Sequence, residues 1–176
     1  QEDSAFRDSQ PGKIMHEMRR GEMAGLHEVP FGQYYGGVDT TPLFVMLAGA
    51  YEKRTGDRTL IDRLWNALLA AAAWIERRLD NSSTGFLDYP RSEKPGLVNQ
   101  SWKDSHDSMF HADGRFPRGP VAVLEVQGYA YAALKAVSEL TAARGDQAKA
   151  DAWQQRAERL RRAIEEKFWV PEMGFY

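Results

Sequence analysis

Four stretches of the chain carry apolar side chains at the three- and four-residue spacing that is typical of amphipathic helices. The clearest is residues 59–79, where one face is formed by Ile61, Leu64, Trp65, Leu68, Ala72, Ile75 and Leu79. The same spacing predicts helices from about residue 40 to a stop near Gly56, over residues 121–143 and over residues 147–168. Because the periodic segments are all helical, the pattern predicts an all-α fold.

The second half of the chain repeats the plan of the first. Gly56-Asp57 recurs as Gly145-Asp146, and Gly85-Phe86 recurs as Gly174-Phe175, each 89 residues later. Between these anchors the apolar face formed by Leu64, Leu68, Ala71 and Ile75 corresponds to Trp153, Ala157, Leu160 and Ile164. The spacing predicts a helical-hairpin repeat, in which each hairpin buries its apolar face against a further hairpin or a dimer partner.

Both long loops, residues 21–39 and 87–119, precede the first helix of a hairpin. We therefore expect them on the same face, opposite the tight Gly-Asp turns. Antiparallel helix pairs with long loops at one end favour a helical toroid, and a plain helix bundle is the alternative.

The composition of the chain excludes several classes of binding partner and site. The chain of 176 residues is 43% hydrophobic, which suits a single domain with a respectable core, and its net charge of -2 gives no case for nucleic acid or an anionic membrane surface. The longest apolar run, residues 68–75, is too short to span a bilayer. With no cysteine, disulfides and thiolate metal sites are excluded, but this absence does not identify the compartment. We predict a cytoplasmic location.

The chemistry concentrates in the loop of residues 99–113. This stretch gathers acidic and imidazole side chains around aromatic ones: Trp102, Asp104, His106, Asp107, Phe110, His111 and Asp113. A carboxylate beside an aromatic ring can have a raised pKa and act as a general acid. Trp102 and Phe110 are interpreted either as a platform for a sugar ring or as core residues.

Three segments resemble a known family. They are G-Q-Y-Y-G-G-V-D-T-T-P-L-F-V from Gly32, N-Q-S-W-K-D-S-H-D-S from Asn99, and A-D-G-R with G-P-V-A-V-L-E-V-Q-G-Y between Ala112 and Tyr129. In this order they are similar to the bacterial amylo-alpha-1,6-glucosidase and glycogen-debranching-like proteins of the six-hairpin glycosidases. The resemblance implies an (α/α)6 toroid, an α-glucosidic, possibly α-1,6, carbohydrate substrate, inverting hydrolysis and no cofactor.

The resemblance also implies roles for particular residues. Trp102-Lys103-Asp104 matches the Trp-x-Asp shape that carries the general acid in debranching enzymes, which makes Asp104 the first candidate. Asp107 is the rival, since Asp104-Ser105-His106-Asp107 loosely echoes a trehalase motif, although His106 replaces its glycine. Either aspartate could instead cap a turn or pair with a nearby cation.

Further side chains are predicted to contact the sugar. Asp39 at the start of a helix could accept hydrogen bonds from hydroxyl groups while Tyr34 and Tyr35 stack on a pyranose face, or it could be a helix N-cap. Glu125 and Gln127 lie near the start of the helix predicted over residues 121–143, which is an inner helix if the repeat forms a toroid. They are expected to orient the substrate, unless they are a polar pair on the outer face of that helix. The remaining predicted substrate contacts are Trp102, Lys103 and His106.

The expected domain is one glycosidase catalytic domain that covers residues 1–176 and is truncated at both ends, roughly the first half of a toroid. In the resembling enzymes the catalytic base is a glutamate from the later part of the barrel, so we expect it outside this segment and expect the segment alone to be inactive. The remaining half of the toroid is then its structural partner.

Other functions stay open at this point. A sugar epimerase or polysaccharide lyase would use His106 or His111 with a tyrosine for proton transfer, and a scaffold protein would only present a helical surface. A metal held by His106, Asp107, His111 and Asp113 is a further alternative, but their spacing fits no known motif, and no metal is predicted.

Overall fold

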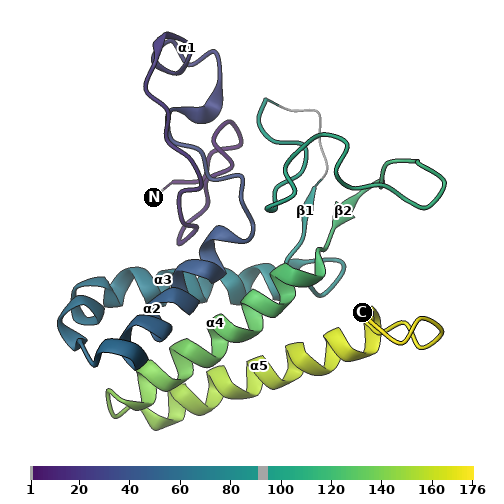
Figure 1. Cartoon of the computed structure of the whole chain (residues 1–176). Helices are drawn as coiled ribbons and strands as arrows, with labels where there is room; N and C mark the ends of the chain where they lie inside the picture. Colours follow the sequence, from purple (N-terminus) through teal and green to yellow (C-terminus); the bar gives the residue numbers. More distant parts are fainter. Residues whose placement is uncertain (1, 91–94) are drawn as a thin grey trace.

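The computed structural model describes residues 2–90 and 95–176, and its long helices pack together into one helical region, from which the long loops project at one end (Figure 1). The elements in chain order are α1 (Glu22–Gly25), the 3-10 turn η1 (Pro30–Gly32), α2 (Thr40–Thr55), α3 (Arg58–Asn81), β1 (Tyr89–Pro90), β2 (Pro120–Val121), α4 (Leu124–Ala142) and α5 (Gln147–Phe168). Within the described residues, the only sheet is the antiparallel pair of β1 and β2. The all-α prediction is confirmed.

Both helical hairpins turn at a Gly-Asp pair. Gly56 ends α2 with a φ of 67°, and Gly145 follows α4 with a φ of 86°, a left-handed conformation that suits glycine. The carboxylate of Asp57 then accepts a hydrogen bond from the Thr59 N–H at 2.9 Å, and that of Asp146 accepts one from the Lys149 N–H at 3.1 Å. The same residue types end and begin the helices of both hairpins, in agreement with the 89-residue repeat.

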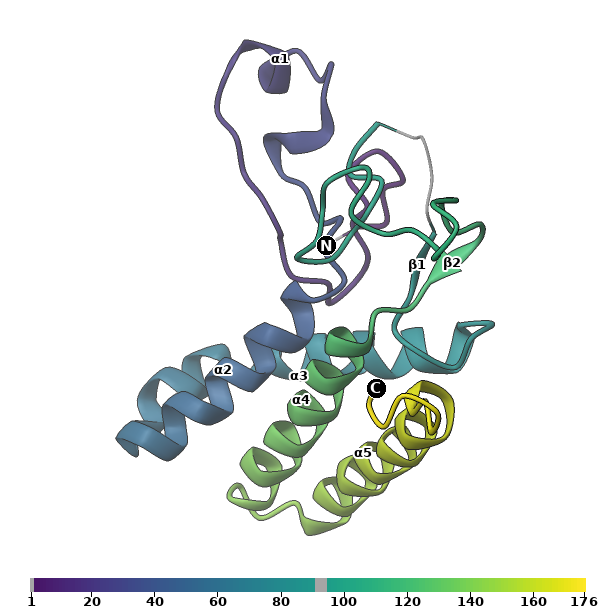
Figure 2. The same cartoon turned by 45° about the vertical axis from the view of Figure 1, so that its right-hand side comes forward.

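The two hairpins meet through their first helices. Helix α4 packs against both α2 and α5, so α2 and α4 lie side by side, and α3 passes behind both of them in the view of Figure 2. The two helices are in tight contact at Gly49 of α2, where a Cβ atom would lie 2.6 Å from the Cβ of Ala136 in α4. The core beneath this crossing is apolar and includes Val45, Leu68, Ile75, Val126, Leu134 and Val137.

The N-terminal residues dock on the outer helix α3. The indole N–H of Trp74 donates to the side chain of Gln10 at 2.7 Å, and Gly12 lies so close that a Cβ there would be 2.1 Å from the Ala70 carbonyl oxygen. The Lys13 ammonium lies 5.7 Å from the centre of the Trp74 ring. Burial lowers the pKa of Lys13 to about 8, although the nearby Asp8 carboxylate acts in the opposite direction.

Helix α4 begins later than the pattern predicts. The expected start was residue 121, whereas the helix starts at Leu124 because Pro120 and Val121 pair with Pro90 and Tyr89. This pairing joins segments about thirty residues apart in the chain, so local periodicity carries no signal of it. The other three helices end within two residues of their predicted bounds.

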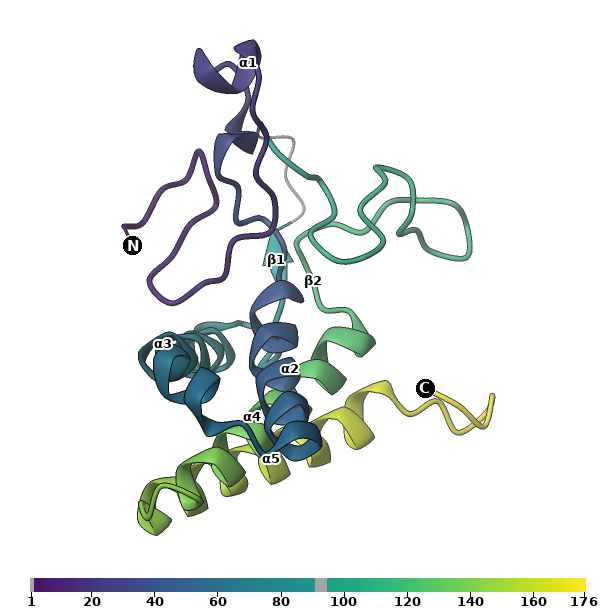
Figure 3. The same ribbon diagram turned by 60° about the vertical axis from the view of Figure 1, so that its left-hand side comes forward.

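Both long loops lie at one end of the helical region, as the sequence predicts. Helices α2 and α4 begin at this end, and the Gly-Asp turns lie at the other (Figure 3). No helix in the described part of the chain is both long and apolar enough to cross a lipid bilayer.

Candidate functional site

A buried asparagine organises the loop that carries the candidate acids. Asn99 has no exposed surface, and its Nδ2 lies within hydrogen-bonding distance of the carbonyl oxygens of Ser105 (2.6 Å) and His106 (3.3 Å). Its Oδ1 accepts from the Tyr89 hydroxyl at 3.2 Å. The Ser108 hydroxyl lies 2.7 Å from the Lys103 carbonyl oxygen, across the same turn. The backbone is therefore held on both sides of Asp104.

The carboxylates of Asp104 and Asp107 are exposed on this fixed turn. Trp102, two residues before Asp104, is 58% exposed, and the Lys103 ammonium lies 5.0 Å from the centre of its ring. Phe110 is also exposed. The interpretation of Trp102 and Phe110 as core residues is therefore wrong, and both rings are available at the surface beside the two candidate acids.

Asp39 lies next to this loop. The N–H of Val38 donates to the Gln100 carbonyl oxygen at 2.8 Å, which joins the two backbones one residue from Asp39 and four residues from Asp104. Asp39 occupies the N-cap position of α2, but its side chain makes no capping hydrogen bond. It is only 8% exposed, and the one hydrogen bond that its carboxylate makes with the described residues is a long one of 3.4 Å from the Thr40 hydroxyl. A nearly buried carboxylate with spare acceptor capacity favours a ligand-binding role over a cap.

Of the two tyrosines before Asp39, Tyr34 differs from the sequence prediction. Tyr34 is fully buried and packs edge-on against Phe31 at 5.0 Å, so its ring has no face for a pyranose. Burial raises its pKa above the ordinary value, and the carboxylate of Asp8, to which its hydroxyl donates at 2.8 Å, adds to the rise. Tyr35 is half-buried, and its N–H donates to the Arg7 carbonyl oxygen at 2.9 Å.

Glu125 and Gln127 lie on different faces of α4. Glu125 is exposed in the first turn, at the end where the loops gather. Gln127 is fully buried, and its amide exchanges hydrogen bonds with the backbone of Leu87: Oε1 accepts from N at 2.9 Å, and Nε2 donates to O at 2.8 Å. Nε2 also donates to the Val123 carbonyl oxygen at 3.0 Å. The structure therefore gives Gln127 a backbone-fastening role in place of the predicted substrate contact.

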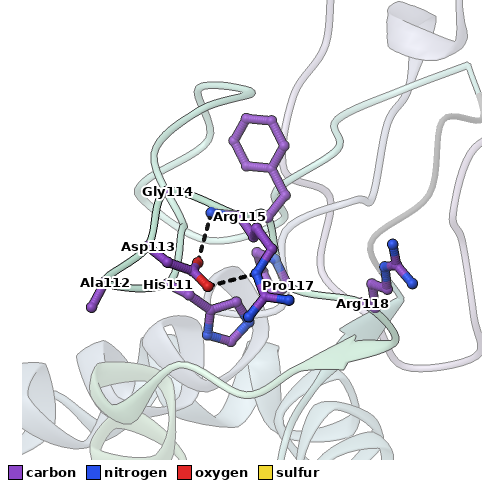
Figure 4. Close-up of a pocket in the computed structure, with 8 residues that line it drawn as sticks. His111, Ala112, Asp113, Gly114, Arg115, Pro117 and Arg118 are labelled. Carbon is purple, nitrogen blue, oxygen red and sulfur yellow. Dashed lines mark hydrogen bonds and ion pairs between the residues drawn. The ribbon is translucent and has the colours of Figure 1, made fainter.

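The loop after the candidate acids folds around a pocket of about 970 Å³, which residues 111–118 line (Figure 4). In it Asp113 accepts hydrogen bonds from the N–H of Arg115 at 3.0 Å and from its Nε at 2.6 Å. These bonds hold the pKa of the Asp113 carboxyl below its usual value. Arg118 forms no hydrogen bond or ion pair with the described residues, and its guanidinium is exposed.

The histidines of this region are not part of a metal-binding cluster among the described residues. The His106 ring lies edge-on to Phe116, with centroids 5.1 Å apart, and the His111 carbonyl oxygen accepts from the Gly114 N–H. Residues 2–90 and 95–176 contain no group of three or more side chains placed to hold a metal ion.

Several residues that shape the site escaped the sequence analysis. Asn99 and Ser108 are the first and last residues of the motif N-Q-S-W-K-D-S-H-D-S, but nothing in the sequence showed that their side chains hold the backbone of this motif in place. Asp8 lies outside every predicted element, yet its carboxylate accepts hydrogen bonds from Tyr34 and Gln100. The contacts of Asp8 join segments far apart in the chain, so only the fold reveals them.

Comparison with known proteins adds one match. The family model described as "Mannosylglycerate hydrolase MGH1-like glycoside hydrolase domain" matches residues 30–176, a range that includes both helical hairpins and the loop of residues 99–108. No curated protein matches the chain significantly.

Proposed function

The chain belongs to the family of MGH1-like glycoside hydrolase domains, and from this premise we propose that it cleaves α-glucosidic bonds, including α-1,6 bonds, with inversion at the anomeric carbon. Membership makes it a glycoside hydrolase domain that acts on a carbohydrate. This family membership therefore favours hydrolysis over the epimerase, lyase and scaffold alternatives. The linkage and the stereochemistry are our inference from the motifs around Asp39, Asp104 and Glu125.

In the proposed reaction Asp104 is the general acid. It donates its proton to the glycosidic oxygen as the bond between that oxygen and the anomeric carbon breaks, and the oxygen keeps the bonding electrons. A water molecule attacks the opposite face of the sugar and loses a proton to a second carboxylate, which in inverting enzymes stands about 6.5–9.5 Å from the acid. Asp107 is the alternative acid on the same turn.

The observation that supports this assignment best is the fixed backbone around Asp104. A general acid must be held within hydrogen-bonding reach of the leaving oxygen, and Asn99 and Ser108 hold the turn on both sides of Asp104. The bond between Val38 and Gln100 sets Asp39 beside this turn, where its spare acceptor capacity can bind sugar hydroxyls. Exposed Trp102, Lys103, His106 and Glu125 are the further proposed substrate contacts.

Proton NMR of the reaction tests the proposal. The full-length protein is incubated with α-linked glucosides, among them isomaltose and maltose, and the anomer that appears first is recorded. Early β-glucose indicates inversion, because a single displacement reverses the configuration of an α-linkage. Early α-glucose would contradict inversion, and no cleavage of any α-glucoside would contradict the proposed substrate class.

The family description suggests a second candidate substrate, an α-mannosyl glycerate. Its aglycone carries a carboxylate, and the exposed guanidinium of Arg118 in the pocket of Figure 4 is suited to bind one. Asp113 already neutralises Arg115 in this pocket, so Arg118 is the cation there that is without an ion-pair partner among the described residues.

Replacing Arg118 by Gln separates the two substrates. A charged hydrogen bond contributes about 1.5–3 kcal/mol, so the substitution is expected to raise KM for mannosylglycerate about tenfold or more and to leave KM for a neutral α-glucoside unchanged. Steady-state kinetics with both substrates measure this. Arg162→Gln, which removes an exposed guanidinium on α5, is the control. An equal rise in KM for both substrates would show that Arg118 does not read the carboxylate.

A further inference from the structure

Asp8 lies between the two loops that carry the proposed site residues. One oxygen of its carboxylate, Oδ2, accepts a hydrogen bond from the Tyr34 hydroxyl at 2.8 Å and another from Nε2 of Gln100 at 3.1 Å. Tyr34 is five residues before Asp39, and Gln100 is four residues before Asp104. The Tyr34 hydroxyl also accepts from the Leu97 N–H at 2.9 Å. A closed hydrogen-bond network therefore runs through Leu97, Tyr34, Asp8 and Gln100.

Two glycines leave room for the phenol at the centre of this network. A Cβ atom on Gly36 would lie 2.1 Å from the Tyr34 hydroxyl oxygen, and one on Gly96 would lie 2.6 Å from it. Gly96 also has a φ of 132°, a backbone conformation that residues other than glycine rarely adopt. Both loops are therefore shaped around the hydroxyl of Tyr34, and the network is a built feature of the fold.

The backbone of Asp8 is also specialised. Its φ of 52° lies in the left-handed region, which costs an ordinary residue about 1–2 kcal/mol and which aspartate and asparagine tolerate better. The ammonium of buried Lys13 donates to the Asp8 carbonyl oxygen at 3.1 Å and holds this turn. The carboxylate is thus presented to Tyr34 and Gln100 from a fixed backbone.

From this geometry we propose that Asp8 is a positioning residue, which sets the place of the loop bearing Asp104 relative to the loop bearing Asp39. The inference rests on the proposed roles of these two aspartates. Asp8 acts through Tyr34 and Gln100. Its loss lets the two loops move apart and misaligns the proton donor with the sugar bound at Asp39.

The test compares Asp8→Gly with Asp8→Asn. Glycine adopts the left-handed backbone without cost and removes the acceptor, whereas asparagine also tolerates this backbone and keeps one oxygen that both donors can reach. Because a misplacement of about 1 Å can cost about 100-fold in rate, Asp8→Gly is expected to lower kcat about 10- to 100-fold. Asp8→Asn is expected to restore most of the loss. Asp3→Gly, which removes an exposed carboxylate from the same segment, is the control.

Hydrogen exchange gives a readout that does not need turnover. The Leu97 N–H is bonded to Tyr34 and the Val38 N–H to Gln100, so both should exchange faster in Asp8→Gly while the amides of α4 stay protected. Unchanged kcat with unchanged exchange at these two amides would overturn the inference, as would a lower Tm with wild-type kcat in the folded protein. If Asp8→Gly fails to fold, Tyr34→Phe breaks the same network, and wild-type kcat in that variant overturns the inference.

The outcomes also separate this inference from the proposed function. A wild-type protein that cleaves no α-linked glycoside contradicts the proposed function, and the exchange of Leu97 and Val38 still tests the network. A wild-type protein that cleaves an α-glucoside and an Asp8→Gly variant that cleaves it equally well contradict the positioning role alone.

Discussion

Replacing Asp104 by Asn in the full-length protein is expected to lower kcat on an α-linked glucoside about 10²- to 10⁴-fold, with little change in the affinity for the sugar. The amide has the shape of the carboxyl group but cannot donate a proton to the leaving oxygen. The fold should be unaffected, because the side chain is exposed and the turn is held by Asn99 and Ser108. Steady-state kinetics measure kcat, and calorimetric titration with a product sugar measures the affinity.

Leaving-group chemistry provides a sharper check on this prediction. A glucosyl fluoride needs little protonation to depart, so Asp104→Asn should hydrolyse it much better, relative to wild type, than it hydrolyses a glucoside with a poor leaving group. Asp113→Asn is the control, because the Asp113 carboxylate accepts hydrogen bonds from Arg115, which favour its ionised form and lower its pKa, the opposite of what a general acid needs. A large loss in Asp107→Asn and none in Asp104→Asn would transfer the acid role to Asp107.

Replacing Gly49 by Leu is expected to destabilise the protein by about 1–3 kcal/mol or more. Gly49 lies in the contact between α2 and α4, and even a single added carbon would lie 2.6 Å from the Cβ of Ala136, which is buried with it. A leucine side chain must therefore push the two central helices apart and open the core between the hairpins. Chemical denaturation monitored by circular dichroism measures the change in the free energy of unfolding.

Gly128→Leu is the matched control for this prediction. Gly128 is also within a helix, α4, but a Cβ there would meet open space. Leucine favours the helix over glycine by up to about 1 kcal/mol, so this variant is expected to be more stable than wild type. Opposite signs for the two substitutions would attribute the effect at Gly49 to the helix crossing. A loss of stability in both would contradict this explanation.

The helices could be predicted because their determinants are local. Gly56 and Gly145 supply the left-handed residue that ends a helix, Asp57 and Asp146 cap the next one, and all four residues lie at the turns themselves. The start of α4 escaped prediction because Val121 is held by a strand partner, Tyr89, from elsewhere in the chain.

The site was predictable as a list of residue types and much less as an arrangement. The sequence placed the carboxylates of Asp39 and Asp104 on one face, since both precede or begin the first helix of a hairpin. It could not show that Tyr34 is buried, because the cause is a carboxylate 26 residues away and the absence of side chains at Gly36 and Gly96. Gln127 was misread for the same reason, since the backbone that it fastens lies 40 residues earlier.

The Gly-Asp turns lie in a region that is suited to the attachment of a label or a surface linker. They lie at the end of the helical region away from the loops (Figure 1). Arg144, beside the second turn, forms an ion pair with Asp62 near the start of α3. A cysteine introduced at an exposed position such as Lys149 would be the sole thiol of a chain that has none. A fluorophore or surface linker attached there would leave the loops that carry the proposed site residues open, so single-molecule studies could follow substrate capture on an immobilised enzyme.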